Sequence, residues 1–285
     1  MTIWVTHILN GLSFGALLFL LSSGFTLAFG LMKIVNIAHG SFYMLGAYVS
    51  ISTMSATGNF AVAVLAGAFA VLVFAVILEE MLLRRFHLND LAQILLTMGV
   101  AFIVSRLTLI IWGGDPLVIR TPPSWLLGPI FVGDFAFPKY RIFLIIVALA
   151  VGVILWTFLD RTRMGAFVRA CVDDEEMASA MKINTRAVFT GMFGLSGLLA
   201  GFGGAIGAPY IGAYPGLDFN ILPLALVVVI VGGLGSLSGA ALGSVLVGVV
   251  DSLGKALFPE LSYFTIFVPM IIILAIRPRG LLGRA

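Results

Sequence analysis

Long apolar runs separated by short polar connections make up this chain. No Asp, Glu, Lys or Arg precedes Lys33, and none lies between Lys33 and Glu79. These runs exceed the roughly 20 residues that a helix needs to cross a bilayer. The shorter runs are candidates for half-helices or re-entrant segments. The pattern predicts candidate spans at residues 8–31, 38–56, 60–83, 90–112, 140–159, 187–209, 219–234, 236–252 and 262–276.

Composition supports a polytopic membrane protein. Hydrophobic residues make up 61% of the 285-residue chain and charged residues only 10%, against roughly 25% charged in a soluble domain. The N-terminal stretch lacks the basic region of a cleavable signal peptide, so we expect residues 8–31 to be a retained span. The expected fold class is an all-α polytopic membrane protein of about 8–10 transmembrane or re-entrant helices. Residues 1–285 are expected to form a single transmembrane domain.

Basic residues cluster unevenly between the two predicted faces. If residues 160–186 are cytoplasmic, the positive-inside rule places the N-terminus outside and the C-terminus inside. Nucleic-acid binding is not expected despite the pI near 9.2, because the basic residues sit at the ends of apolar runs. The inside would hold Lys33, Arg84, Arg85, Arg161, Arg163, Arg169, Lys182, Arg186, Arg277, Arg279 and Arg284, and the outside Arg120, Lys139, Arg141 and Lys255.

Small residues and prolines indicate packing and loops rather than cofactor chemistry. Pairs such as Gly11 and Gly15, Gly197 and Gly201, or Gly203 and Gly207 let helices approach closely in lipid, as do Gly235, Gly239 and Gly243. Five prolines between residues 113 and 139 predict an ordered external loop without helix. The single cysteine, Cys171, excludes an intramolecular disulfide. No metal-ligand or nucleotide-binding spacing is present.

The segment from Asp160 to Arg186 is rich in charged residues, unlike the apolar sequence on either side of it. Asp173 or Asp174 can cap a helix whose first turn carries Glu175 and Glu176, which suits the helix dipole. An apolar strip follows, and Asn184 is predicted to end a helix of about three turns, roughly 15 Å. Two interpretations are open: a solvated connection whose charges fix topology, or a docking helix for a soluble partner. Methionines in helical register favour docking, since they form adaptable contact surfaces.

Several motifs carry a resemblance to a known family. The order Arg169-Ala170, Ala178, Ala180 and Ile183-Asn184 resembles the EAA-type coupling segment of bacterial ABC importer permeases. The stretches GLMKIVNIAHGSFYMLG from Gly30, VGGLGSLSG from Val231 and RPRGLLG from Arg277 are similar to those of the high-affinity branched-chain amino acid permeases, specifically the H-type subunit. The resemblance spans nearly the full length.

The resemblance implies a heteromeric importer with the fold of the vitamin-B12-type and ribose-type permeases. Its implied partners are a second homologous permease subunit, two cytoplasmic ATPase subunits, a periplasmic substrate-binding protein and the lipid bilayer. The chain itself would hold no cofactor, and ATP and magnesium would bind the partner ATPases. The implied location is the bacterial inner membrane, with the C-terminus cytoplasmic. Within residues 161–186, the implied coupling residues are Arg169, Ala170, Asp173, Asp174, Glu175, Glu176, Ala178, Ile183 and Asn184.

A substrate path is indicated by polar residues near or inside the spans. Asn36 and His39 are expected near the cytoplasmic end of the second span, where capping and packing compete with substrate contact. Arg106 can snorkel outward or face the external mouth. Asp218 and Asp251 are expected to be solvated charges at external turns, and Glu80 is expected to pair with Arg84. The candidate path residues are Asn36, His39, Ser41, Tyr43, Met44 and Arg106.

The leading function is therefore the permease subunit of an ATP-driven importer for leucine, isoleucine, valine or similar small carboxylates. One alternative is an ion-coupled secondary transporter, which is disfavoured because only Arg106 offers a charge deep in a span. A permease for urea or aromatic acids within the same family is another. An enzyme is not expected, since no paired acid and base or nucleophile grouping is present.

Overall fold

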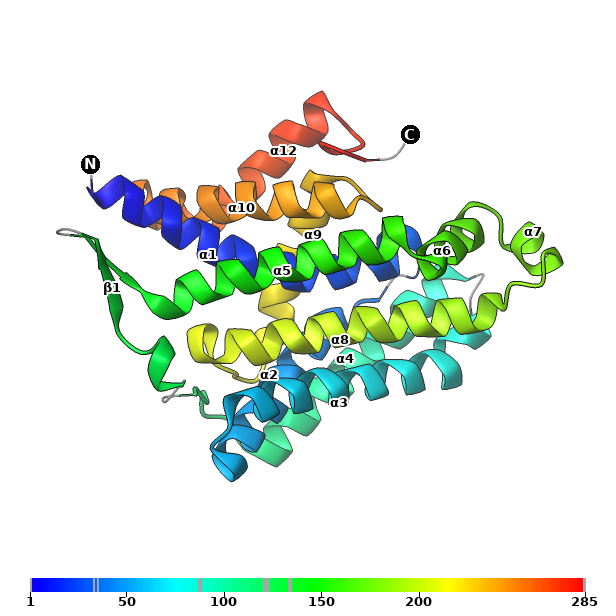
Figure 1. Cartoon of the computed structure of the whole chain (residues 1–285), viewed down its shortest axis with the longest axis horizontal. Helices are drawn as coiled ribbons and strands as arrows, with labels where there is room; N and C mark the ends of the chain where they lie inside the picture. The colour runs from blue at the N-terminus through cyan, green and yellow to red at the C-terminus, as the bar shows by residue number, and fades with distance from the viewer. Residues whose placement is uncertain are drawn as a thin grey trace.

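A bundle of long helices lying side by side forms the structure, a computed structural model that describes residues 2–32, 34, 36–86, 89–119, 123–132 and 135–283 (Figure 1). Three of the basic residues used for orientation, Lys33, Arg120 and Arg284, lie outside these residues. The long helices are α1 (Thr2–Phe25, continued by the π-helix Thr26–Leu31), α2 (His39–Thr57), α3 (Phe60–Met81), α4 (Asp90–Trp112), α5 (Lys139–Arg161), α8 (Thr185–Ile211), α9 (Leu217–Gly232) and α10 (Leu237–Leu257).

Short elements complete the described chain. The 3-10 turn Leu83–Phe86 follows α3, and the 3-10 turn Pro259–Leu261 leads into α11 (Ser262–Thr265) and α12 (Phe267–Ile276). Two further short helices, α6 (Arg163–Asp173) and α7 (Glu175–Ala180), join α5 to α8. The predicted span at 262–276 is thus broken in two at Ile266, while the other predicted spans each fall on a helix.

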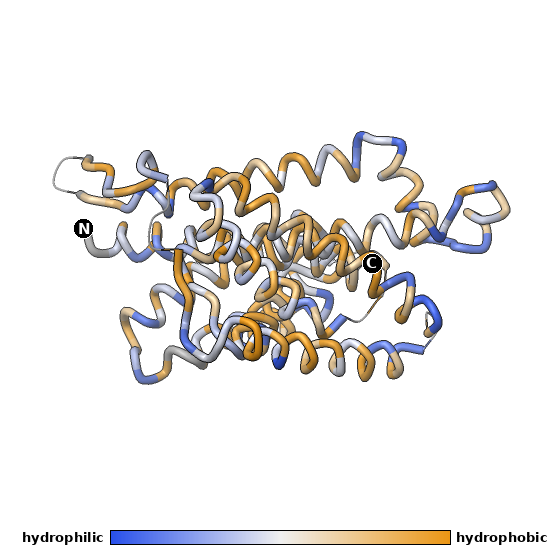
Figure 2. The backbone as a smooth tube through the Cα atoms, turned by 90° about the horizontal axis from the view of Figure 1, so that it is seen from below, coloured by the Kyte–Doolittle hydropathy of each residue, from blue (hydrophilic) through white to orange (hydrophobic). Residues whose placement is uncertain are grey.

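Within the described residues, six helices are long and apolar enough to cross a membrane: α1, α3, α4, α5, α8 and α10. Helices α9 and α12 are apolar but shorter. The hydropathy colouring is largely orange along the long helices and blue in the connections at their ends (Figure 2). The prediction of an all-α polytopic membrane fold is confirmed.

Helix α2 is the inner element of the bundle. Residues 39–44 and 46–48 in its first half are buried, and it packs against α3, α8 and α9. Glycines make this packing possible: a Cβ on Gly67 of α3 would lie 2.6 Å from the carbonyl oxygen of Gly46 in α2. The predicted glycine contacts are confirmed on α1 too, where a Cβ on Gly15 would lie 2.6 Å from the Ser244 oxygen of α10. Close helix approach therefore replaces the hydrophobic drive that lipid cannot supply.

The proline-rich connection between α4 and α5 differs from the prediction. It contains a 3-10 turn, Ser124–Leu126, and an antiparallel pair, β1 (Pro129–Val132) with β2 (Phe135–Pro138). Apolar residues in both segments suit strands. Pro129 pairs with Pro138 at the base of the hairpin, at the first residue of β1 and the last residue of β2, where a missing N–H costs little. The expectation of a loop without helix was wrong on this point. The hairpin lies at the end of the bundle opposite α6 and α7 (Figure 1).

Candidate functional site

Helix α6 follows the end of α5 at one end of the bundle, and α7 projects farthest from that end (Figure 1). Thr162 caps α6, because its hydroxyl accepts a hydrogen bond from the Gly165 N–H at 3.1 Å. Arg169 of α6 donates to the Leu159 carbonyl and lies 3.9 Å from the Asp160 carboxylate. These contacts fix α6 to the last turn of α5.

The helix predicted after Asp174 is present, but it is shorter than expected. Asp174 adopts an extended conformation and caps α7, accepting from the Met177 N–H at 2.9 Å. The helix then ends at Ala180, because Lys182 takes a left-handed conformation (φ 64°) and the Ile183 N–H bonds the Ala178 carbonyl at 3.1 Å. This is the hydrogen-bond pattern that ends many helices. The single three-turn helix expected from Asp174 was therefore wrong.

Asn184 has a different role from the one predicted. Its side chain accepts from the Ala187 N–H at 3.0 Å, so it begins α8 rather than ending α7. The preceding helix α6, with 11 residues, was not predicted separately. Its sequence signal was Thr162, a favoured N-cap residue, before a run with helical spacing.

This α6–α7 segment has one buried and one exposed side. Val168, Cys171 and Ala178 are buried against the bundle. Burial raises the pKa of the Cys171 thiol, and the negative charge of the nearby Glu175 raises it further. Met177 and Met181 are 61% and 72% exposed. Asp173, Glu175 and Glu176 are exposed beside them, at the positive end of α7. The arrangement offers a partner an acidic tip next to an adaptable apolar surface.

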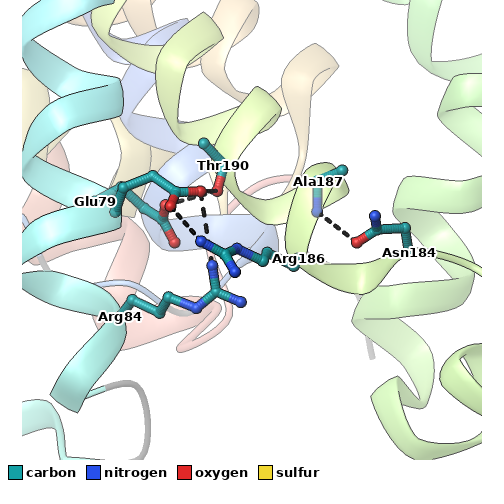
Figure 3. A network of polar contacts seen from close by, with 7 residues as sticks. Glu79, Arg84, Asn184, Arg186, Ala187 and Thr190 are labelled. Carbon is teal, nitrogen blue, oxygen red and sulfur yellow. Dashed lines mark hydrogen bonds and ion pairs between the residues drawn. The ribbon is translucent and has the colours of Figure 1, made fainter.

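A polar cluster clamps the start of α8 to the end of α3 (Figure 3). The Arg186 guanidinium lies 2.6 Å from the Glu80 carboxylate, which also lies 3.6 Å from Arg84, the pair predicted from sequence. The Thr190 hydroxyl donates to Glu79 at 2.6 Å and to Glu80 at 3.1 Å. Any displacement of α7 that reaches α8 is therefore shared with α3.

Asn36 and His39 lie deeper than predicted. The His39 Nε2 atom is 3.0 Å from the Leu21 carbonyl, although the α1 helix continues ten residues further, to Leu31. Ten helical residues correspond to about 15 Å, so the connection after Leu31 folds back into the bundle and α2 begins inside it. The placement at the cytoplasmic end was wrong because hydropathy cannot show a chain that turns back. Both side chains are fully buried, and neither side-chain polar atom of Asn36 has a hydrogen-bond partner.

Ser41 leads to a site residue that the sequence reasoning missed. Its hydroxyl donates to the Asp218 carboxylate at 2.8 Å, and Asp218 is only 2% exposed. The expectation of a solvated Asp218 was wrong: the chain re-enters the bundle after α8, so the first turn of α9 lies beside Gly40 of α2. A lone acidic residue within a long apolar stretch was the available signal. Asp251 is also buried, 2.7 Å from Lys255, so that expectation was wrong as well.

Of the remaining candidate path residues, two are buried in the bundle and one is exposed. Tyr43 and Met44 are buried at the centre of the bundle, and the Tyr43 ring meets Gly203 and Gly207 of α8. Arg106 is exposed on the outer face of α4 and is not brought to this central cluster. We use the name central polar cluster for Asn36, His39, Ser41 and Asp218.

Three of the glycine-bearing motifs meet at the end of the bundle that carries α6. Gly30 approaches the backbone of Gly235, and a Cβ on Gly280 would lie 2.6 Å from Gly233. The Leu281 and Leu282 N–H groups bond the Val231 and Gly232 carbonyls, each at 2.9 Å. Segments far apart in sequence are thus joined backbone to backbone. We call this arrangement the glycine joint.

Six long apolar helices in the described residues, packed around a buried polar cluster, are the arrangement of a polytopic membrane protein. Comparison with known proteins agrees. Residues 7–274 match the family described as "Branched-chain amino acid transport system / permease component", and the chain belongs to this family.

Relatives of this chain match it over nearly their whole length. It is 26% identical to the high-affinity branched-chain amino acid transport system permease protein BraD of Pseudomonas aeruginosa, covering 99% of this chain and 96% of that protein. It is 28% identical to LivH, the permease protein of the same kind of system in Escherichia coli K12, with the same coverage. The solved structure of PsaBC from Streptococcus pneumoniae in complex with Fab aligns with 95% of this chain and 89% of its own, at 12% identity and a TM-score of 0.48, a likeness too weak to define the fold.

Proposed function

We propose that this chain is the permease subunit of an ATP-driven ABC importer whose cargo is leucine, isoleucine, valine or a similar small carboxylate. It receives substrate from a periplasmic binding protein and passes it to the cytoplasm by alternating access, without chemical change of the cargo. It works with a second homologous permease subunit and two cytoplasmic ATPase subunits, which carry the ATP and magnesium. The assembly sits in the bacterial inner membrane with the C-terminus of this chain in the cytoplasm.

The observation that carries this proposal is the α6–α7 segment. It is capped at both ends, fixed to α5 by Arg169, and exposes Met177 and Met181 beside an acidic tip. A short helix this polar on one side needs a partner to gain stability from its exposed apolar face. The residues named for coupling, from Arg169 to Asn184, fall within this segment or at its joint with α8. The proposal assigns this segment to a groove on one of the two ATPases.

Displacement of α7 has a direct route to the central polar cluster. From α7 it passes through Ile183 and the Asn184 cap into α8, and through the Glu80–Arg186 clamp into α3. Both α3 and α8 pack closely on α2, which carries His39 and Ser41. Closure of the ATPases would thus move the helices that surround the buried polar groups, as packed elements with two arrangements do.

The test is recovery of the ATPases with the permease. Reversing two charges at the tip, Glu175→Lys with Glu176→Lys, is expected to abolish co-purification of an ATPase pair and ATP-dependent leucine uptake into proteoliposomes. Asp115→Lys with Glu260→Lys is the matched control, because both residues are exposed and lie outside the α6–α7 segment. Unchanged ATPase recovery with the tip variant would refute the docking assignment. Uptake of urea or aromatic acids in preference to leucine would refute the proposed cargo.

One observation favours the ion-coupled alternative. The sequence argument against it was the lack of deep charge, and the buried Asp218 removes that argument. The two functions are separated by energy source. Uptake that survives ATP depletion and collapses with an ionophore would support ion coupling, and Asp218→Asn would then abolish uptake while leaving ATPase recovery intact.

A further inference from the structure

An apolar groove of about 510 Å³ opens between α5 and α10, with α1 as its floor. The floor is Leu12, Ala16 and Phe19, which lie on one face of α1. Small residues on the flanking helices, including Ala148, Gly152 and Ala241, create the space. The Ser244 hydroxyl in the wall donates to its own helix at the Ala241 carbonyl, 2.8 Å away, so it offers no free donor to the groove.

The groove has the length of one leaflet. It follows α5 from Ile145 to Trp156, a separation of eleven positions or about 16 Å of helix. Half of a hydrocarbon core of about 30 Å is about 15 Å. A transmembrane helix of a neighbouring subunit would cross both leaflets, whereas a lipid acyl chain fills only one.

One end of the groove is cationic. It continues into a second pocket of about 250 Å³ that shares Trp156, Leu237 and Ser238 with it and is lined by Arg169 and Asp160. The Arg161 guanidinium lies over the Trp156 ring, 5.3 Å from its centre. Trp is favoured at the membrane–water interface, and basic pockets between spans attract anionic head groups. The two arginines outweigh Asp160, so the mouth of the groove carries net positive charge.

We infer that this groove binds a phospholipid with an anionic head group, its phosphate beside Arg161 and Arg169 and one acyl chain lying along Gly152 and Phe19. The ligand is recognised by three features together: an apolar slot of leaflet length, an aromatic ring at the interface, and paired guanidinium groups at the mouth. This site depends only on the membrane location of the chain and not on its proposed cargo or ATPases.

The test measures lipid retained by the full chain after exchange into detergent, by native mass spectrometry, with phosphatidylglycerol and phosphatidylcholine of the same acyl chains as probes. Val153→Trp fills the groove from a side chain that is already 60% exposed. We expect it to reduce retained phosphatidylglycerol about tenfold, the effect of leaving roughly two methylene groups unburied. Val62→Trp, at an exposed site on α3, is the matched control and should retain lipid like the parent chain.

A second pair guards against a folding defect in one variant. Gly152→Leu should act like Val153→Trp, and Gly99→Leu, at an exposed position of α4 with no atom near its Cβ, should not. Arg161→Ala should lower the preference for phosphatidylglycerol over phosphatidylcholine about fivefold, as expected for one basic residue near a charged surface. Arg85→Ala, exposed near the end of α3, should leave the preference unchanged.

Equal lipid retention by the parent chain and both groove-filling variants would overturn the inference. So would a loss of the second permease subunit from the purified complex with Val153→Trp while bound lipid stays constant, because the groove would then be a contact between subunits. Binding of both lipids without preference, unaffected by Arg161→Ala, would refute the head-group assignment.

Discussion

A methyl group added at Gly67 would push α3 away from α2. The Cβ of Gly67→Ala would lie 2.6 Å from the Gly46 carbonyl oxygen and 3.1 Å from the Ala205 side chain. Both neighbours are held in place, one as helix backbone and the other as a buried residue of α8. Neither can rotate away, so the helices themselves must separate.

The size of the effect follows from this distance. Real Cβ atoms essentially never approach closer than 3.0 Å, and ordinary contacts begin at 3.4 Å. From 2.6 Å, α3 must therefore shift by about 0.4–0.8 Å. A gap of that size forfeits about a quarter of the dispersion energy between the separated surfaces. Overpacking of this kind typically costs about 1–3 kcal/mol. For a chain of this size, we expect the apparent melting temperature to fall by roughly 3–10 °C.

The assay is thermal unfolding of the full chain in detergent, followed by tryptophan fluorescence or by the fraction remaining monodisperse. Gly191→Ala is the control, because it makes the same change on the exposed side of α8 with no atom within 4 Å of the new Cβ. It should melt at the parent temperature or slightly higher, since alanine favours helix by up to about 1 kcal/mol over glycine. If Gly67→Ala melted with the control, the close α2–α3 packing would not constrain the bundle, and the route from α7 to the central polar cluster would lose its basis.

Two further predictions concern the proposed cytoplasmic end. Arg186→Ala should change stability little, because solvent screens the exposed pair of Arg186 and Glu80. It should nevertheless lower the amount of substrate transported per ATP hydrolysed. Arg186→Lys should restore part of that ratio, and equal ratios in all three proteins would contradict the clamp. Cys171 should need a higher pH than an exposed thiol to react with iodoacetamide, because burial raises the pKa of the thiol and the thiolate is the reactive form. The control is Met181→Cys in a Cys171→Ala background, an exposed thiol that should react at lower pH, and matching pH profiles would argue against burial of Cys171.

Hydropathy predicted where the helices lie, because long apolar runs such as 90–112 have few other stable forms in a membrane. Hydropathy could not show which helices lie in the interior of the bundle. Helix α2 carries Ser, Thr and Tyr side chains and is still the inner element, since its neighbours and its own carbonyls satisfy several of its hydroxyls, as Tyr48 does for Ser52 at 3.0 Å.

The candidate site was predicted unevenly for a related reason. Local chemistry gave the capped α7 helix at Asp174 and the Glu80–Arg84 pair, both set by residues close in sequence. Ser41 and Asp218 are 177 positions apart, and only the return of two connections into the bundle brings them together. Path residues that are brought together by such re-entrant connections cannot be predicted from local sequence spacing.

The glycine joint limits where this protein can bend. Because Gly30 meets Gly235 and Gly233 meets Gly280 without intervening side chains, these contacts have no rotamers to exchange and little room to slide. The ends of α1, α9 and α10 that meet at the glycine joint should therefore move as one rigid body, together with residues 280–283, which bond to Val231 and Gly232. Opening and closing must then occur between this rigid body and the pair formed by α3 and α8. The central polar cluster would lie at the interface between these two moving parts.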